Sequence, residues 1–493
     1  MLGRTGRKWT AGMVGLIAIA ALLGAPQRSV GQCLGDCAGD NQVEIADLVI
    51  GVDIALGTQP LSVCPAFDDG SGMVTIAVLI TAVDNSLGGC PGASLVVDTL
   101  ADTTSADACS LRDAINIASG RPVSGSGCGQ VIAHSIFFVE GLSGTIVLTE
   151  TLPSIAGDVS IQGPANDGIT ISGEHHVRVL TIEAGASAVL RNLTIANGDV
   201  NDGGAGIKNS GALYAQACTV RDNRSAISSG GIVNMGGEMT IVQSTFLTNA
   251  GAAGGAILSL GGNVTIENST FSANASGDGP GGAIDASGSL TVFGSTFSAN
   301  TSRGSGAAIA VGGTAVIINS TFANNVSNAP GGAVSASGNA TIIASTFAGN
   351  SATAQFAGSA IFVSSGGSIT LKSTALARPA DLFPPICLTS LSGPIVNGGY
   401  NISADASCGF GTSTGASGQT IGDSVDPMFD PAGLQNNGGP TQTIALLPNS
   451  PAVAAIPPAS CTDENGDPLT IDQRGEPRPT QSPCDIGAFE LSE

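Results

Sequence analysis

The sequence Asn268-Ser-Thr-Phe-Ser-Ala-Asn274 returns almost unchanged as Gly294-Ser-Thr-Phe-Ser-Ala-Asn300 and as Asn319-Ser-Thr-Phe-Ala-Asn-Asn325. Related phrases are centred on Phe246 and Phe347, so this Phe recurs at intervals of 25 or 26 residues. A repeat of this length is typical of solenoids, in which each repeat is one structural unit stacked on the last.

Two further apolar columns keep the same step. One column follows Gly-Gly-Ala sequences and contains Ile207, Ile232, Ile257, Ile284, Ile309, Val334 and Ile361. The other precedes each Phe by five residues and contains Ile241, Ile266, Val292, Ile317 and Ile342. Within a repeat, stretches such as Leu290-Thr-Val292 alternate apolar and polar residues for only a few positions before a turn. This pattern predicts two or three short strands per repeat and no helix.

These observations predict an all-β fold, a single-stranded right-handed parallel β-helix of about ten coils over residues 143–385. The apolar columns would become internal ladders. The Asn that closes each phrase forms its own column, which we interpret as structural because Asn tolerates left-handed backbone geometry and its amide can bond to the next coil. The members of this column are Asn223, Asn249, Asn274, Asn300, Asn325 and Asn350.

Composition and the N-terminus bear on where the chain works. The net charge of −22 argues against nucleic acid or anionic membrane as a partner and disfavours polyanionic substrates. Residues 1–31 have the form of an export signal, with Arg4, Arg7 and Lys8 ahead of an apolar run. We therefore expect a secreted, extracellular or cell-surface protein whose mature chain has no transmembrane segment, a setting in which its cysteines can pair.

Residues 32–91 contain a second, separate duplication with an offset of 31 residues, in which Cys33 matches Cys64 and Ile45 matches Ile76. Each copy is a turn-rich loop leading into a segment with apolar residues at helical spacing. In the first copy, carboxylate and carbonyl oxygens recur at the spacing of a twelve-residue calcium loop. The candidate ligands for Ca²⁺ are Asp36, Asp40, Gln42 through its carbonyl, Glu44 and Asp47.

These two loop-helix units resemble a dockerin, a small calcium-dependent module that docks into cohesin. The resemblance implies one bound Ca²⁺ and a cohesin-like receptor as partner. It departs from the pattern in the second copy, where Phe67 stands in the place of Asp36 and Val78 in that of Asp47. The alternative is a relic held by disulfides without calcium. The pairing of Cys33, Cys37, Cys64 and Cys90 stays open, since four cysteines allow three connectivities.

Residues 92–142 are expected to cap the first coil. In Cys109-Ser-Leu-Arg-Asp-Ala-Ile115 and the residues that follow, the apolar positions are spaced as one face of a short helix. The phrase resembles the CSLREAI motif that precedes many bacterial surface β-helices, with Asp113 in the place of its Glu. The repeats resemble those of polymorphic outer-membrane proteins and the pectin-lyase-like superfamily. We expect Cys109 to be bonded to Cys128.

Residues 386–493 are expected to form disulfide-held C-terminal coils and a cap. The disulfide candidates are Cys387, Cys408, Cys461 and Cys484. Phrases such as Asp472-Gln-Arg-Gly-Glu-Pro-Arg-Pro479 resemble the C-terminal region of choice-of-anchor Q domain proteins. Its arginines and acids are interpreted as ion pairs within this cap.

Chemistry on the rod would require clustered acids, because glycosidases and lyases use paired carboxylates, or a base with a cation. The richest group on the rod is Asp199, Asp202 and Asp222 with Arg221 and Arg224, and a second is Asp278 with Asp285. Both are interpreted as surface residues. The favoured hypothesis is an exported, non-catalytic β-helix acting as an adhesin-like interaction module. The alternative is a carbohydrate-active enzyme, a polysaccharide lyase or hydrolase of pectin-lyase-like fold.

Overall fold

The computed structural model describes residues 33–38, 43–68, 73–76, 78–80, 82–83, 94–129, 133–165, 168–354, 358–378, 385–390 and 393–491. The chain divides into two compact units, residues 1–85 and 86–493. The export signal expected over residues 1–31 and the cysteine Cys90 lie outside the described residues. No helix in the part of the chain that the structure describes combines the length and apolar character that crossing a membrane requires.

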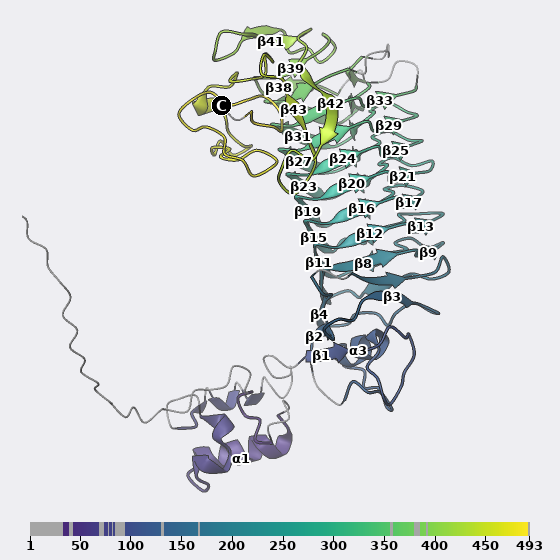
Figure 1. The fold of residues 1–493 in the computed structure, drawn as a ribbon, viewed down its shortest axis with the longest axis vertical. Coiled ribbons are helices and arrows are strands. Elements are labelled where there is room, and N and C mark those ends of the chain that lie inside the picture. The colour runs from purple at the N-terminus through teal and green to yellow at the C-terminus, as the bar shows by residue number, and fades with distance from the viewer. Residues whose placement is uncertain are drawn as a thin grey trace, which may run out of the picture. The chain divides into compact units, whose positions relative to one another are not determined.

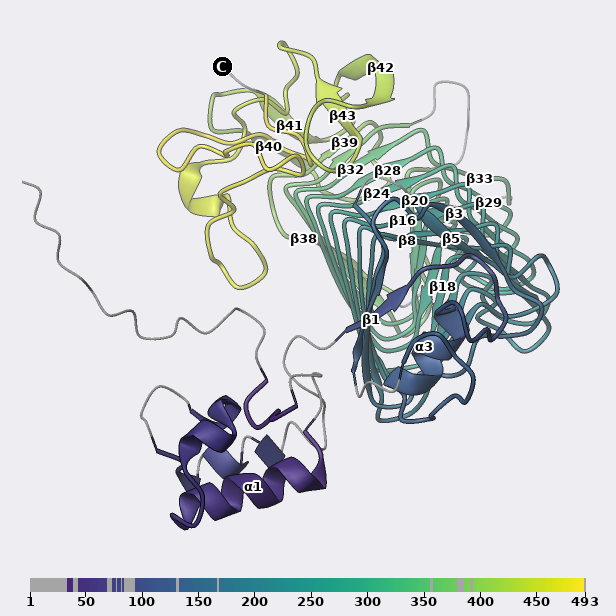
Figure 2. The same ribbon diagram turned by 60° about the horizontal axis from the view of Figure 1, so that its bottom comes forward.

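The N-terminal unit is helical. It contains α1 (Ile45–Ala55) and the short 3-10 helices η1 (Leu61–Val63) and η2 (Pro65–Phe67) (Figure 2). Residues 76, 78–80, 82 and 83, in the second copy of the duplication, are also helical. A disulfide joins Cys37 to Cys64, and Cys33 is disulfide-bonded as well. These bonds tie loop to loop in a unit that has few residues from which to build a core.

The second unit is a stack of coils whose strands pair in parallel with the coils above and below (Figure 1). A regular coil has four strands, whereas two or three were predicted. The fourth strand has only two residues, too few for alternation of apolar and polar residues to be visible in the sequence. It pairs nonetheless, because the coil before and the coil after offer parallel partners in register, as in Thr301↔Val326.

The strands of the regular coils form four sheets. The 12-stranded sheet contains β1 (Ser94–Val97), β2 (Ser135–Phe138), β4 (Asp158–Gln162), β7 (Ser187–Arg191), β11 (Ala212–Gln216), β15 (Glu238–Val242), β19 (Asn263–Glu267), β23 (Ser289–Phe293), β27 (Thr314–Ile318), β31 (Asn339–Ile343), β35 (Ser368–Lys372) and β38 (Ile395–Asn397). The 13-stranded sheet contains β3 (Gly144–Val147), β5 (Ile169–Ser172), β8 (Leu193–Ala196), β12 (Thr219–Arg221), β16 (Thr245–Leu247), β20 (Thr270–Ser272), β24 (Thr296–Ser298), β28 (Thr321–Ala323), β32 (Thr346–Ala348), β36 (Ala375–Leu376), β39 (Ile402–Ser403), β41 (Thr420–Asp423) and β40 (Thr412–Thr414).

The other two sheets lie between these in the chain order of each coil. The nine-stranded sheet contains β6 (Leu180–Ile182), β10 (Ile207–Asn209), β14 (Ile232–Asn234), β18 (Ile257–Ser259), β22 (Ile284–Ala286), β26 (Ile309–Val311), β30 (Val334–Ala336), β34 (Ile361–Val363) and β37 (Cys387–Thr389). The seven-stranded sheet contains β9 (Asp199–Val200), β13 (Arg224–Ser225), β17 (Ala250–Gly251), β21 (Ala275–Ser276), β25 (Thr301–Ser302), β29 (Val326–Ser327) and β33 (Ser351–Ala352).

The predicted apolar columns are the core of the rod. Phe246, Phe271, Phe297, Phe322 and Phe347 are fully buried, and their rings stack with centroids 4.6–5.0 Å apart and planes within 5–8°. The separation equals the spacing of parallel strands, so the backbone ladder sets the ring stack. The Ile column that runs from Ile207 to Ile361 is buried throughout on the nine-stranded sheet.

The Asn column is buried and hydrogen-bonded from coil to coil. Each amide Nδ2 from Asn223 to Asn325 donates to the Oδ1 of the next Asn at 2.9–3.0 Å. The expectation of left-handed backbone at these Asn residues is wrong, because φ is positive at the residue before each one. Those residues have φ of 53–56° and are Asp222, Thr248, Ala273, Ala299 and Asn324. The Asn is needed for its inward amide rather than for its backbone freedom.

The N-terminal cap is the helix α3 (Leu111–Ala118), which packs against β1, β2 and β4. The hydroxyl of Ser110 accepts a hydrogen bond from the Asp113 amide at 3.1 Å and so begins the helix. The apolar side of α3, including Leu111 and Ile115, is fully buried. A disulfide joins Cys109 to Cys128. The helix therefore covers apolar surface that the first coil would otherwise expose.

The C-terminal segment does not only cap the end of the rod, as was expected, but also folds back along its side. This segment includes β42 (Phe429–Gln435), β43 (Thr443–Leu446) and η3 (Pro458–Ser460). It covers the outward Thr residues of β24, β28 and β32, which are 0–2% exposed. The contact was not predictable because partners such as Gln473 and Thr296 are 177 residues apart in sequence.

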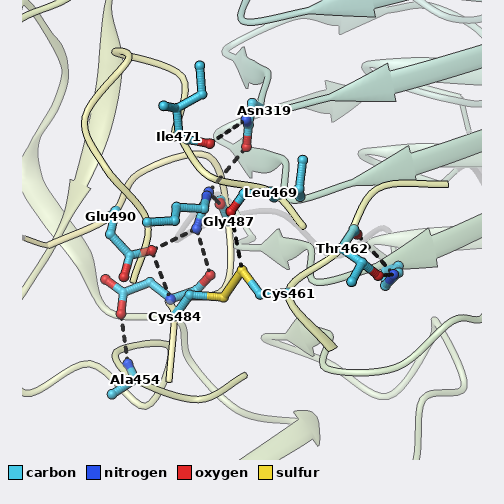
Figure 3. The surroundings of a disulfide bond; sticks show 12 residues. Asn319, Ala454, Cys461, Thr462, Leu469, Ile471, Cys484, Gly487 and Glu490 are labelled. Carbon is cyan, nitrogen blue, oxygen red and sulfur yellow. Dashed lines mark hydrogen bonds and ion pairs between the residues drawn. A yellow bond between two sulfur atoms is a disulfide. The ribbon is translucent and has the colours of Figure 1, made fainter. Parts of the chain in front are cut away.

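Buried polar bonds hold this segment in place. Gln473 Nε2 donates to Thr296 Oγ1 at 2.8 Å, and the Thr321 hydroxyl donates to Gln473 Oε1 at 2.6 Å. Arg478 is fully buried and pairs with Glu490 at 2.8 Å (Figure 3). Disulfides join Cys387 to Cys408 and Cys461 to Cys484, the same four cysteines that the sequence offered as candidates.

Candidate functional site

The N-terminal unit has an internal twofold relation. The amide of Gly35 donates to the carbonyl of Ala66 at 3.1 Å, and these two residues are equivalent in the duplication. A methyl group at Gly35 would lie 2.6 Å from the Cβ of Ala82, so the first loop packs against the second helical segment. Each copy thus packs its loop on the helix of the other.

Phe67 explains why the second loop departs from a calcium loop. Its ring is fully buried and packs on Gly51 of α1, where an added Cβ would lie 2.3 Å from the ring. Gly51 is the equivalent of Ala82. In the position that Asp36 occupies in the first copy, the second copy therefore uses an aromatic ring as core. A hydrophobic group cannot serve as a ligand for a hard cation, so the structure fits one calcium loop at most.

The surface that these helices present is apolar. On α1 and its C-cap, four apolar side chains point away from the unit at a spacing of 4, 3 and 4 residues, which places them on one helix face. We call them the first stripe, which consists of Ile45, Val49, Val52 and Leu56 with exposures of 79%, 55%, 44% and 73%. The second copy repeats three of these positions. This second stripe consists of Ile76, Ile80 and Val83, with exposures of 77%, 56% and 41%.

The five candidate calcium ligands are only partly described. Asp36 and Asp47 are 3% and 7% exposed, whereas Glu44 lies at the surface. Asp47 and Glu44 form a reciprocal capping box at the start of α1, in which the Glu44 amide donates to Asp47 Oδ2 at 2.9 Å. Asp40 and Gln42 lie outside the described residues. Among the described residues alone, no group of three or more acids, histidines or cysteines is assembled around a metal position.

The charge of this unit nevertheless fits a cation. Residues 32–93 contain eight Asp and Glu residues and no Lys, Arg or His. Burial of the Asp36 and Asp47 carboxylates is costly unless positive charge or hydrogen bonds compensate it. The unit itself offers no basic side chain for this purpose. Carboxylate oxygens in a turn-rich loop are the donor set that Ca²⁺ prefers.

The acids proposed from the sequence as a cluster on the rod do not form one. Asp202 pairs with Arg178 and lies 3.9 Å from Lys208, on the coil edge before β10. Asp222 pairs with Arg221 at 2.8 Å and accepts a hydrogen bond from Thr248. Each carboxylate thus has its own cation or donor at the surface, an arrangement typical of solvated ion pairs.

The rod also carries a shallow groove of about 680 Å³ over the seven-stranded sheet. Its floor is built from small residues of β13, β17, β21, β25 and β29. Arg224 and Arg303 lie along it, and Arg303 is 3.7 Å from Asp278, with both side chains exposed. None of the described side chains that line the groove is aromatic. A ring platform for sugar stacking is therefore not among them.

The comparisons with known proteins concern the rod. Residues 143–322 match the family model described as a right handed beta helix region. Together with the parallel pairing of successive coils, this match shows that the rod is a right-handed parallel β-helix. No curated protein and no solved structure matches the chain.

Proposed function

We propose that this right-handed β-helix is the exported, non-catalytic body of an interaction protein, and that the N-terminal unit docks it onto a protein receptor. The observation that carries the proposal is the pair of apolar stripes. Seven large apolar side chains at equivalent positions of a duplicated unit are 41–79% exposed. Contiguous exposed apolar surface on a small soluble unit is typical of a binding interface.

The receptor that this surface fits is a cohesin-like protein. The stripes offer branched aliphatic side chains on helix faces, which would pack into an apolar surface, while the acidic remainder of the unit would form a polar rim. The eight acids and the lack of basic residues favour a receptor whose rim is basic or neutral.

Calcium has a defined task in this proposal. The residues that would hold it are those of the first loop, with Asp36 and Asp47 as its buried carboxylates. A bound cation would offset their mutual repulsion and fix the loop against the start of α1. The stripes would then be presented on a rigid helix, which lowers the entropic cost of docking.

The docking proposal is tested with the full mature chain and a panel of immobilised cohesin modules, by surface plasmon resonance in calcium. We expect binding by the natural chain and a loss of at least 100-fold in affinity for the combined Val49→Ser and Ile80→Ser variant. The matched control is Thr58→Ala, an exposed change just beyond α1, which should leave affinity unchanged. The docking proposal fails if no cohesin binds, or if the stripe variant binds as well as the control.

Calcium binding is tested separately by calorimetric titration. Asp47→Asn retains an oxygen that can accept the Glu44 amide, so it preserves the cap of α1 while removing the charge. We expect Asp36→Asn and Asp47→Asn each to weaken Ca²⁺ binding by more than tenfold, and Asp53→Asn, on the same helix, to have little effect. Absence of any calcium binding by the natural chain would favour the disulfide-held relic.

The alternative of a carbohydrate-active enzyme makes the opposite prediction for the rod. It requires turnover of a polysaccharide that is lost in Asp202→Asn or Asp222→Asn. Because both carboxylates are bonded to neighbouring cations or hydroxyls, we expect these variants to alter only surface charge. Turnover by the natural chain that either variant abolishes would replace the non-catalytic proposal.

A further inference from the structure

The outer face of the nine-stranded sheet has a hollow where small side chains follow a large one. Parallel register places Leu258, Asp285, Ala310, Ser335 and Phe362 in one outward column on successive coils. Ala310 and Ser335 are too small to fill the space between Asp285 and Phe362. The result is a pocket of about 100 Å³, which we call the Asp285 pocket.

The Asp285 carboxylate has no partner among the described residues. It makes no hydrogen bond or ion pair with them, although the side chain is partly buried in the pocket wall. Asp285 is also the one charged side chain among the described residues that line the pocket. The neighbouring turns contribute Pro280 and Ser305, neither of which is charged. A carboxylate removed from water without a counter-charge is a costly arrangement that a cationic ligand would relieve.

The hydroxyl groups around it are available as acceptors. Ser335 donates its hydrogen to Ser305 Oγ at 3.3 Å, and Ser364 donates to the Ala336 carbonyl at 3.2 Å. Ser337 likewise donates to the Val311 carbonyl. A hydroxyl has one donor and two acceptor positions. With their hydrogens directed into the protein, these hydroxyls offer lone pairs, so the pocket calls for a ligand rich in donors.

The remaining walls decide between kinds of cation. Phe362, Pro280 and Val311 give the pocket an apolar side. A hard metal ion such as Ca²⁺ requires six to eight oxygen ligands, which one carboxylate and a few hydroxyls do not supply. A primary ammonium group has three donors and no acceptor, and its alkyl chain suits the apolar wall. Its charge can also interact with the face of a Phe ring.

We propose that the Asp285 pocket binds the primary ammonium group of an alkylamine, as carried by a lysine side chain or an amino sugar. The ammonium would pair with the Asp285 carboxylate and donate to the surrounding hydroxyl oxygens. The proposal is independent of docking through the N-terminal unit, because it assigns a separate site on the rod.

The pH dependence of this binding follows from burial of the carboxyl group. Burial raises the pKa of Asp285 to about 6. The ligand binds the ionised form, so affinity is full well above pH 6 and falls as the pH drops through 6. One unit below that value about a tenth of the carboxyl is ionised, and binding should be about tenfold weaker.

The test is calorimetric titration of the full mature chain with n-butylammonium chloride at pH 7.5 and pH 5. We expect one saturable site at pH 7.5 that weakens about tenfold at pH 5. Asp285→Asn, which keeps the shape of the side chain, should weaken binding at least tenfold. Ala310→Leu should do the same by filling the hollow, since the column already carries Leu258 two coils earlier. Asp278→Asn, an exposed acid near the same turn, is the matched control.

The source of the amine is distinguished by two further ligands. Tighter binding of Nα-acetyl-lysine amide than of glucosamine would assign the pocket to a lysine side chain, and the reverse would assign it to an amino sugar. Circular dichroism and thermal melting establish that the variants are folded. The proposal is overturned if no amine saturates a site, if Asp285→Asn binds as well as Asp278→Asn, or if Ca²⁺ binds there and displaces the amine.

Discussion

Removing one amide from the buried Asn column should destabilise the rod by an amount that can be worked out from its bonds. Asn300 Oδ1 accepts from the backbone amide of Asn274 at 3.0 Å, and Asn300 Nδ2 donates to the Phe271 carbonyl at 3.0 Å. Asn300→Ala leaves both of these buried backbone groups without a partner. Asn274 Nδ2 keeps its bond to Phe246, and Asn325 Oδ1 keeps the Asn300 amide. Two orphaned groups at about 1–3 kcal/mol each predict a loss of about 2–6 kcal/mol.

Urea unfolding followed by circular dichroism measures this loss. The matched control is Asn263→Ala, which removes an exposed Asn that donates only to Glu238 and should cost less than about 0.5 kcal/mol. Asn300→Asp should be no better than Asn300→Ala, because its carboxylate would face the carbonyl of Phe271 and the Oδ1 of Asn325. A loss below about 1 kcal/mol for Asn300→Ala would refute the reasoning that the column carries bonds the backbone cannot replace.

Three further predictions concern the core, the folded-back segment and its buried acid. Phe297→Ala empties a fully buried position between two stacked rings and should cost about 3–5 kcal/mol in urea unfolding; a loss near that of an exposed Phe would place the column outside. Gln473→Ala leaves the hydroxyls of Thr296 and Thr321 without their partner, so limited proteolysis should release the C-terminal segment sooner, whereas an unchanged cleavage rate would argue against its anchoring role. Burial raises the pKa of Glu490 to about 7, although the Arg478 charge opposes this rise. The unfolded chain ionises at lower pH, so this group should lower the melting temperature as the pH rises from about 4.5 to 7, and Glu490→Gln should remove that slope.

The regular part of the rod could be predicted from sequence because every coil repeats the same constraints. Each Phe must meet the Phe of the next coil, so a step of 25 or 26 residues fixes the register of all three apolar columns. The left-handed turn residue could not be predicted, because Thr248, Ala273 and Asn324 share the geometry without sharing a chemical type. There the column of tight turns, and not residue preference, sets the backbone.

The sites were less visible in the sequence for two different reasons. The apolar face of α1 could be read from its spacing, but that spacing cannot tell an exposed stripe from a core stripe. Only the packing of Phe67 on Gly51 shows which side of the helix faces inward. Asp285 was expected to point outward and does, yet its partial burial depends on small residues in the next two coils. A signal was present, namely Ala310 and Ser335 in that column, but it has meaning only once the register is known.

The direction of the Asn column has a consequence for how such a rod can change in size. Every rung donates forward and accepts from behind, so an interior coil offers the same connections at both of its faces. A coil such as residues 250–274 could be duplicated or deleted and its neighbours would still find matching partners. The folded-back segment holds the coils of β24, β28 and β32, so this freedom belongs to the coils before them. Each added coil would move the α3 cap about 4.8 Å further from the segment. The rod can therefore act as a spacer whose reach is set by the number of interchangeable units.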